Sequence, residues 1–536
     1  MRGSSASHSD TREPAPFVAP AGPARAAVAL TVAAATFALY ATTFDARSDG
    51  VVLGNDVLDY ADQMLSAPGG LVWNAHHLLV HVLDALVQRA LLGCGAEPGF
   101  ATAWRAEQLV AAAGGAACAA LVAGFVAQIA GLVRGALLGA ICAVAAGNWL
   151  YAASGETYLP AIAASTGLVV CSLRICLGLS DEGWHRPALW LGLACLLRQD
   201  SVLVVPALFV LLRPAHALRA TLAAGGVTLG LYAGAWAWAG GESAFLSWLR
   251  GLAETGQWGR TPGLTQFGQA AGLSLAALAW ITWTSLPLGL IALGMLLLPL
   301  VPPRQLRGGF GRALLGLGAW IALRYLFFAW WQPGNLEYHT GNVAPFLLLV
   351  GLCLRPPPAL TLARTLTSGW QHLRAPLLLT VAVVLLARSN GILLLWPNRA
   401  ADIAPRLELA AALARPAPTA PTRGLVLALD PLTGKALLRA PREGVDIADA
   451  SLAAGFGSAI GSPERSALLE RTRTVLASGG GVVAVVDRVL PERMGWADAQ
   501  LDPEFLAALE SLGEPQHLKD TEGRVWALVL RSAPGD

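Results

Sequence analysis

The sequence has little charge for its length. Charged residues make up 13% of the 536 residues, whereas hydrophobic residues make up 55%, and the mean hydropathy is +0.54. A soluble domain carries about 25% charged residues, so this chain has too few to cover a water-exposed surface of its size. A protein whose surface is mostly covered by lipid does not need them. The composition therefore excludes a chain of soluble domains only and predicts a polytopic membrane protein.

Clusters of basic residues and of cysteines are also missing. The net charge is only +2, with the basic residues scattered through short loops, which gives no electrostatic footprint for nucleic acid. The seven cysteines form no CxxC pair and no metal-type cluster, so we interpret them as small hydrophobic residues. No internal repeat is found. A polar stretch of roughly 24 residues precedes the first apolar run, which argues against a cleaved signal peptide.

What the sequence has instead is about ten apolar runs of membrane-crossing length. They fall near 26–44, 103–132, 135–151, 157–173, 187–212, 218–239, 270–301, 313–330, 340–354 and 376–396. The run at 187–212 is interrupted by Arg198, Gln199 and Asp200. Because charges are costly in the middle of a membrane, we expect two half-spans that turn back at these residues.

That hairpin places most of the basic loops on one side of the membrane. This side carries Arg12, Arg25, Arg134, Arg174, Arg186, Arg213, Arg219, Arg304, Arg307, Arg312, Arg355, Arg364 and Arg374, and the other side carries Arg47, Arg89, Arg250 and Arg260. The positive-inside rule then predicts a cytoplasmic N-terminus in the cell (inner or plasma) membrane. The loops at 45–101, 154–158, 241–269 and 332–339 and the whole tail face outward.

The chain is predicted to contain four segments. Residues 1–24 form a disordered cytoplasmic N-terminus, 25–397 a transmembrane domain with its first extracytoplasmic loop at 45–101, 398–422 a linker, and 423–536 an extracytoplasmic domain. In the last segment, β-type runs at 424–429, 481–487 and 525–530 alternate with helical patterns at 463–477 and 503–512. This alternation predicts a small α/β domain with a mainly parallel sheet.

The first outward loop holds the candidates for acid–base chemistry. Asp45, Asp49 and Asp56 follow the first span, and a carboxylate near the membrane surface suits a general base or a metal ligand. A solvated amphipathic helix on the membrane is the alternative for this region, above all for Asp59 and Asp62.

The other outward segments hold candidates for substrate binding. These are His76 and His77 in the first loop, Glu156 and Tyr158 in a short turn, Arg198 and Asp200 at the hairpin tip, and Asn335 and Glu337 in the last turn. An interfacial anchor remains an alternative for the histidines. Arg198 has two interpretations, a local pair with Asp200 or a guanidinium offered to an anionic lipid headgroup. Each motif is weak alone, but all lie on one predicted face.

These features resemble the GT-C superfamily of polytopic glycosyltransferases, broadly the protein O-mannosyltransferase-like bacterial membrane proteins. The resemblance covers roughly 26–396. It is carried by the acidic loop with Asp45 and Asp49, the His76-His77-Leu78-Leu79 run, Gly155-Glu156-Thr157-Tyr158, the hairpin with Arg198 at its tip, and Trp331-Gln332-Pro333-Gly334-Asn335. The chain departs from several of these enzymes in having no glutamate in the loop before Glu97.

The resemblance implies transfer of a sugar from a polyprenyl-phosphate-linked donor to an unknown glycan, lipid or protein acceptor outside the cytoplasm. A first-loop aspartate, best matched by Asp49 with Asp45 and Asp56 as rivals, would act as base, or hold Mg²⁺ or Mn²⁺ in members that need a metal. Arg198 would neutralise the donor phosphate. Two other functions stay open, a transporter or flippase for a lipid-linked substrate and an inactive scaffold of the same fold.

Overall fold

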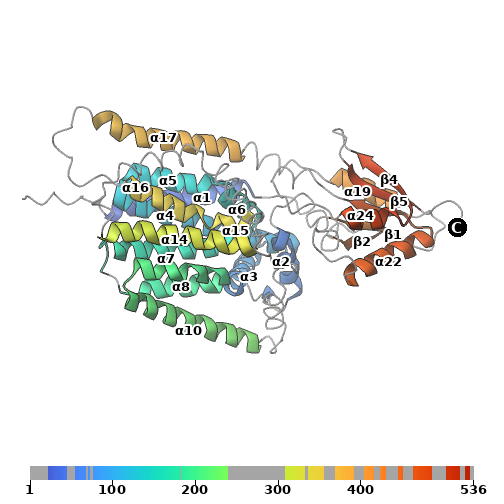
Figure 1. Cartoon of the computed structure of the whole chain (residues 1–536), viewed down its shortest axis with the longest axis horizontal. Helices are drawn as coiled ribbons and strands as arrows, with labels where there is room; N and C mark the ends of the chain where they lie inside the picture. Colours follow the sequence, from blue (N-terminus) through green and yellow to red (C-terminus); the bar gives the residue numbers. More distant parts are fainter. Residues whose placement is uncertain are drawn as a thin grey trace, which may run out of the picture.

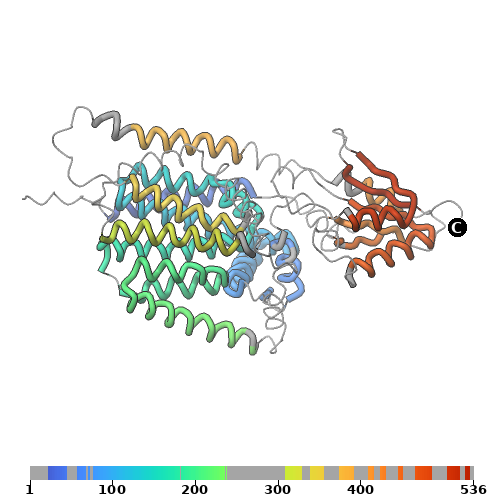
Figure 2. Tube along the Cα trace, in the orientation of Figure 1, coloured from blue at the N-terminus to red at the C-terminus, as the bar shows by residue number. Residues whose placement is uncertain are grey.

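The structure is a computed structural model. It describes residues 22–44, 55–67, 70–72, 77–181, 183–238, 308–331, 336–354, 368–391, 404–415, 423–429, 445–450, 463–485, 503–519 and 525–531. Figure 1 shows two bodies, a helical bundle and, separate from it, a sheet with its helices, and Figure 2 traces the chain through both.

The bundle is built from helices in the first three quarters of the chain. They are α1 (Gly22–Thr42), α2 (Asn55–Ser66), α3 (Leu78–Gly93), α4 (Phe100–Ala130), α5 (Leu132–Val144), α6 (Ala146–Ser154), α7 (Tyr158–Cys176), α8 (His185–Leu197), η2 (Gln199–Val204), α9 (Val205–Leu211), α10 (Pro214–Trp238), α14 (Gly308–Trp331), α15 (Leu336–Thr340), α16 (Val343–Cys353) and α17 (Ser368–Arg388). Helices α4, α7 and α16 run through its interior, where most of their residues are buried.

Several helices have the length and apolar composition of membrane spans. Within the described residues these are Gly22–Thr42, Phe100–Ala130, Tyr158–Cys176 and Gly308–Phe328, and the bent pair of α5 and α6 makes a fifth if it counts as one span. Large apolar side chains project outward, among them Leu30 (70% exposed) and Leu229 (72% exposed). Such exposure suits lipid and not water. The chain is therefore a multi-pass membrane protein. The span predicted at 270–301 lies outside the described residues.

The break between α5 and α6 shows how the bundle tolerates an interrupted helix. The chain bends by 55° at Ala145, so the last carbonyls of α5 lose their helical partners. Three side chains replace them: the Asn148 amide donates to the Cys142 carbonyl at 2.8 Å, the Tyr40 hydroxyl to Ala143 at 2.8 Å, and the Asn390 amide to Val144 at 2.6 Å. With its carbonyls satisfied, the bend is a defined structural element that sets the direction of α6.

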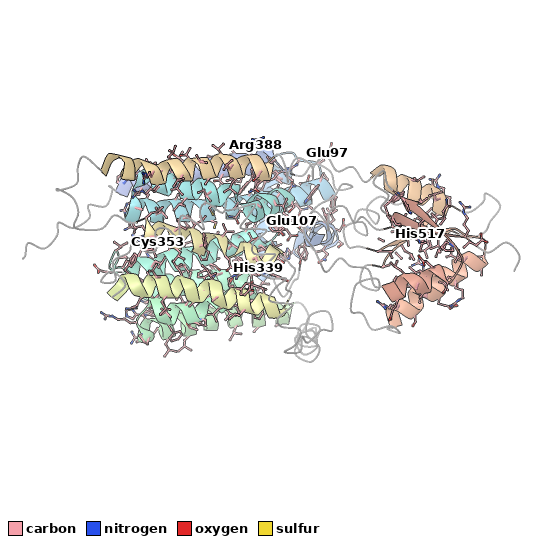
Figure 3. The ribbon with its side chains drawn as sticks, turned by 45° about the horizontal axis from the view of Figure 1, so that its top comes forward. Glu97, Glu107, His339, Cys353, Arg388 and His517 are labelled. Atoms are coloured by element: carbon pink, nitrogen blue, oxygen red, sulfur yellow. The ribbon has the colours of Figure 1, made fainter. Side chains whose placement is uncertain are left out.

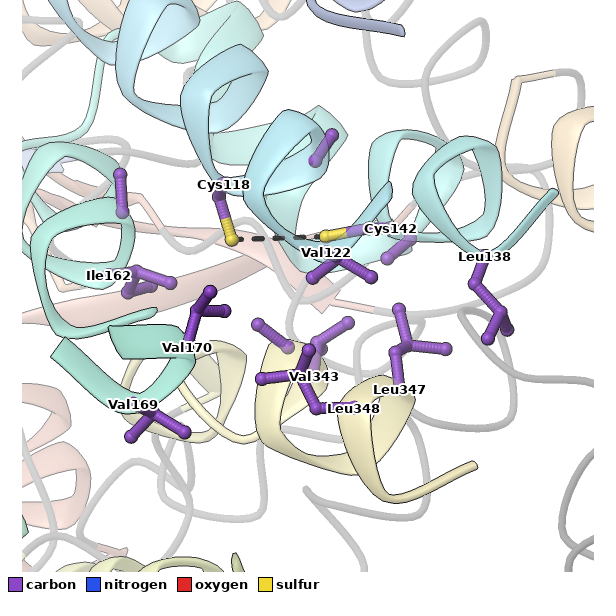
Figure 4. Close-up of a cluster of buried hydrophobic side chains, with 14 of the residues drawn as sticks. Cys118, Val122, Leu138, Cys142, Ile162, Val169, Val170, Val343, Leu347 and Leu348 are labelled. Carbon is purple, nitrogen blue, oxygen red and sulfur yellow. Dashed lines mark hydrogen bonds between the residues drawn. The ribbon is translucent and has the colours of Figure 1, made fainter. Parts of the chain in front are cut away.

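Close packing of small residues joins α4 to α5. A Cβ atom added at Gly135 would lie 2.6 Å from the Ala123 carbonyl oxygen, so only glycine allows this approach. Beside this contact the two helices bring Cys118 and Cys142 to a sulfur–sulfur distance of 3.9 Å in a fully buried apolar cluster (Figure 4). Both cysteines therefore pack as small hydrophobic residues, as the sequence predicts.

The C-terminal body is a five-stranded sheet covered by helices. Strands β1 (Gly424–Ala428), β2 (Val445–Asp449), β3 (Val482–Val485), β4 (Glu514–Lys519) and β5 (Val525–Arg531) lie in the order β2-β1-β3-β5-β4. Apolar residues of α19 (Ala404–Ala414) pack on one face, and those of α22 (Pro463–Ala477) and α24 (Pro503–Glu510) on the other. The α/β prediction is confirmed. The sheet is mixed and not mainly parallel, because β5 pairs antiparallel with both β3 and β4.

Candidate functional site

The interrupted segment at 198–200 forms the predicted hairpin. Arg198 lies against the Tyr158 ring at the start of α7, with its guanidinium carbon 3.6 Å from the ring centre. At the other end of the bundle, Arg312 near the start of α14 donates to the carbonyls of Val210 (3.0 Å) and Leu211 (2.8 Å) at the end of α9. Helix α8 therefore runs toward the Tyr158 end and η2 with α9 runs back.

Five side chains meet at this tip, and we call them the tip cluster: Tyr158, Arg198, Asp200, Arg324 and Tyr338. Arg198 Nε donates to Asp200 Oδ1 at 2.7 Å, and Arg324 Nη2 to the other carboxylate oxygen at 3.4 Å. The Arg198 guanidinium also lies 5.1 Å from the centre of the Tyr338 ring, a cation–π distance. These residues come from α7, the hairpin, α14 and α15, so packing of four segments forms the cluster.

The charges of the tip cluster do not cancel. Among the described residues, two guanidinium groups, always protonated in proteins, face one carboxylate, which leaves one positive charge. The three charged side chains are only 10–13% exposed. A buried surplus charge is costly unless a counter-ion joins it. The tip cluster is thus a candidate site for an anion, and guanidinium groups match the geometry of phosphate.

A second buried cluster from the first loop adjoins the tip. His81 and Asp84 of α3 are 0% and 1% exposed, with 3.4 Å between His81 Nδ1 and Asp84 Oδ2. The Tyr60 ring of α2 lies 4.5 Å from the His81 ring, and His77 lies between His81 (6.1 Å) and Tyr158 (6.3 Å). Burial raises the pKa of Asp84, and attraction to His81 partly opposes this rise. The loop helices are thus packed directly against the tip.

The structure describes some of the residues predicted from the sequence and not others. Asp45, Asp49, His76 and Asn335 lie outside the described residues, and Asp56 and Glu337 lie in α2 and α15 with side chains that are not described. Of the rest, His77, Tyr158, Arg198 and Asp200 come together. Glu156, 1% exposed, accepts a hydrogen bond from the Thr157 amide at 3.3 Å, two residues before Tyr158.

The sequence did not single out Arg324 or Asp84, and within the last outward segment it favoured Asn335 and Glu337 over Tyr338 and His339. Arg324 carried a readable signal, since it is a charged residue within an otherwise apolar run. His339 of α15 is 0% exposed and lies toward the tip end of the bundle. Cys353, the last residue of α16, lies toward the opposite end (Figure 3). Nothing in the local sequence shows that α14 would bring Arg324 to Asp200.

Metal ligands do not gather within the part of the chain that the structure describes. No group of three or more histidine, cysteine, aspartate or glutamate side chains is placed there to hold an ion. Of the first-loop aspartates that the resemblance assigns to a metal, Asp45 and Asp49 are outside that part, and the side chain of Asp56 is not described. Mg²⁺ or Mn²⁺ therefore stays a prediction.

Comparison with known proteins reveals a shared fold. No protein-family model matches the sequence, and no curated protein matches it. The crystal structure of ArnT from Cupriavidus metallidurans in the apo state is similar, with a TM-score of 0.54 at 13% identity, over 94% of this chain and 99% of that chain. The structure of the same ArnT bound to undecaprenyl phosphate gives a TM-score of 0.47 at 12% identity, over 95% and 98% of the two chains, a score too low to add weight.

The likeness covers nearly the full length of both chains. It agrees with the GT-C-like architecture predicted from the sequence. The narrower resemblance to O-mannosyltransferase-like proteins gains no support, because the similar structures are of ArnT. The chain therefore shares the fold of this ArnT, together with a small C-terminal α/β domain.

Proposed function

We propose that the protein is a membrane glycosyltransferase that moves a sugar from a polyprenyl-phosphate-linked donor to an extracytoplasmic acceptor. The observation that carries the proposal is the surplus positive charge of the tip cluster. Arg198 lies at the end of a membrane hairpin, where a lipid headgroup can reach it while its chain stays in the bilayer. A lipid-linked phosphate supplies the anion that the cluster lacks.

The chemistry of transfer assigns a role to each group. An acceptor oxygen attacks the anomeric carbon of the sugar, the bond from that carbon to the phosphate oxygen breaks, and the lipid phosphate leaves. Negative charge grows on that phosphate, and Arg198 stabilises it. A base accepts the acceptor's proton, and we assign this role to Asp49, with Asp45 and Asp56 as rivals. A metal held by the same aspartates is the alternative role for them.

The orientation is part of the proposal. Among the described residues, Arg134 and Arg312 bond backbone carbonyls at the end of the bundle opposite the tip. If the positive-inside rule holds, that end is cytoplasmic, and the tip cluster and the C-terminal domain face outward from the inner or plasma membrane. The acceptor, a glycan, lipid or protein, would approach from that side.

A transporter or flippase of a lipid-linked substrate is the second candidate. Transporters of this kind bind their substrates near the bilayer midplane, between repeated halves. The tip cluster lies instead at one end of the bundle, and the sequence shows no repeat, so transfer is favoured. An inactive scaffold would keep the fold and fail to turn over any donor.

Donor turnover tests the proposal. Wild-type protein in lipid nanodiscs is given radiolabelled polyprenyl-phosphate hexoses and pentoses, with Mg²⁺, with Mn²⁺ or with EDTA. We expect release or transfer of the sugar by the wild type and its loss in Asp49→Asn and Arg198→Ala. Activity that survives in Asp49→Asn moves the base to Asp45 or Asp56. Absence of turnover in the wild type under every condition would overturn the proposal in favour of transport or scaffolding.

A further inference from the structure

Asp200 is shared between two arginines that lie far apart in the sequence. Each oxygen of its carboxylate takes one guanidinium: Arg198 Nε at 2.7 Å and Arg324 Nη2 at 3.4 Å. An arginine and a carboxylate that have only each other usually form two parallel hydrogen bonds. Here Arg198 has a single bond to Asp200, and its Nη1 is buried without a hydrogen-bond acceptor among the described residues. Arg198 therefore keeps donors for a further anion.

Arg324 is held in place by its own surroundings. Its Nη2 also donates to the Tyr338 carbonyl at 3.2 Å, and its guanidinium lies 5.1 Å from the centre of the Phe328 ring. Phe328 in turn stacks on Tyr338 with ring centres 4.4 Å apart. The guanidinium lies directly against Gly341, where an added Cβ would come within 2.6 Å of Nη2. Arg324 is thus fixed before any ligand arrives.

We propose that Arg324 is a positioning residue that draws one oxygen of Asp200 away from Arg198 and so keeps Arg198 available to an anionic phosphate. The inference rests on the proposed function, because it explains how the tip cluster retains its charge. Without Arg324, Asp200 would pair with Arg198 through both oxygens and neutralise it. Arg324 itself need not touch the phosphate.

The proposal can be tested with variants that change the net charge of this group of side chains. The wild-type trio of Arg198, Asp200 and Arg324 carries one positive charge. Arg324→Gln lowers this to zero, Asp200→Asn raises it to two, and the double variant restores one. If Arg324 acts by occupying Asp200, the double variant recovers phosphate binding that the single Arg324→Gln variant has lost. A merely structural role for Arg324 predicts no such recovery.

The experiment measures equilibrium binding in nanodiscs of zwitterionic lipid. The probes are a polyprenyl phosphate, the matching polyprenol without phosphate, and inorganic phosphate as competitor. We expect Arg324→Gln to weaken binding of the polyprenyl phosphate about 10- to 100-fold, the range for a lost charged hydrogen bond. Adding Asp200→Asn should return the affinity to within about threefold of the wild type. Competition by inorganic phosphate separates a headgroup site from one that also needs the lipid.

Arg312→Gln is the matched control. Arg312 lies on the same helix and bonds the same re-entrant segment, but at the opposite end. It should lower thermal stability without changing phosphate affinity. Failure of the double variant to recover binding, with wild type binding the probe, would overturn the inference and leave the proposed function intact. A wild type that binds the polyprenol and its phosphate equally would overturn the proposed function itself.

Discussion

The two ends of the helical bundle both carry arginines, but these arginines have different partners. At the end opposite the tip, Arg134 donates to the Leu354 carbonyl at 3.0 Å, and Arg312 donates to two carbonyls of α9. These two guanidinium groups satisfy the last carbonyls of helices and join one helix to another by hydrogen bonds. At the tip, Arg198 and Arg324 share one carboxylate among aromatic rings.

Under the proposed function, this difference in partners separates structural arginines from arginines that bind the donor. A helix end offers partial negative charge that a guanidinium can meet without a ligand. Among the described residues, the tip offers one carboxylate to two cations, which leaves a positive charge that a further anion can neutralise. The presence of arginine therefore does not identify the site. The site is identified by the ratio of cationic side chains to the carboxylates that pair with them.

Removing an arginine from each end should give the largest contrast. We expect Arg198→Gln to lower donor turnover more than about 100-fold, because the leaving phosphate loses its charged donor. Arg134→Gln should leave turnover unchanged, since its partners are helix-end carbonyls. Initial rates of sugar release in nanodiscs measure both. Equal losses in the two variants would show that the tip has no special role.

Displacing an arginine without removing its charge should have a smaller effect. In Gly341→Ala the new methyl group meets the end of the flexible Arg324 side chain, so we expect the guanidinium to move off Asp200 while the fold persists. Polyprenyl phosphate affinity should fall about three- to tenfold, part of the value of a charged hydrogen bond. Gly318→Ala on α14, which has open space around it, is the control. Unchanged affinity in Gly341→Ala would contradict the fixed placement of Arg324.

The aromatic support of Arg198 should contribute less again. Tyr158→Leu removes the ring beneath the guanidinium, and at the lower end of its range a cation–π contact is worth about 0.5–1 kcal/mol, so affinity should drop about two- to fivefold. Tyr158→Phe keeps the ring and should retain most of the affinity. The same titration compares the two variants, and an equal loss in both would assign the role to the hydroxyl and not to the ring.

The smallest effect is expected in the first loop, on stability and its pH dependence. Burial raises the pKa of Asp84, so the folded protein holds that proton to a higher pH than the unfolded chain does. Wild-type stability should therefore fall as pH rises above the ordinary aspartate range, around 4, and through the raised pKa. Asp84→Asn does not titrate, so its Tm relative to the wild type should increase over that pH interval. A difference in Tm that stays constant with pH would contradict the burial of an ionisable Asp84.

Much of the fold could be predicted because its signals are local. The apolar runs and their lengths predict helices that cross a membrane, and the charges at 198–200 predict a turn because charge is costly in lipid. Strands β1, β3 and β5 and helices α22 and α24 follow from short-range patterns. Strands β2 and β4 were missed, since β4 is almost entirely exposed and lacks an apolar alternation.

Two properties can be predicted without any tertiary structure: the chain is a membrane protein, and Tyr158, Arg198 and Asp200 lie at one end of it. Hydropathy and the cost of charge in lipid decide both properties, whatever the helices pack against. The packing of distant helices is what brings Arg324, 124 residues beyond Asp200, to one oxygen of that carboxylate and places Gly341 where it leaves room for the guanidinium. Such contacts depend on how α14 packs on the hairpin, and no local pattern records the packing of distant helices.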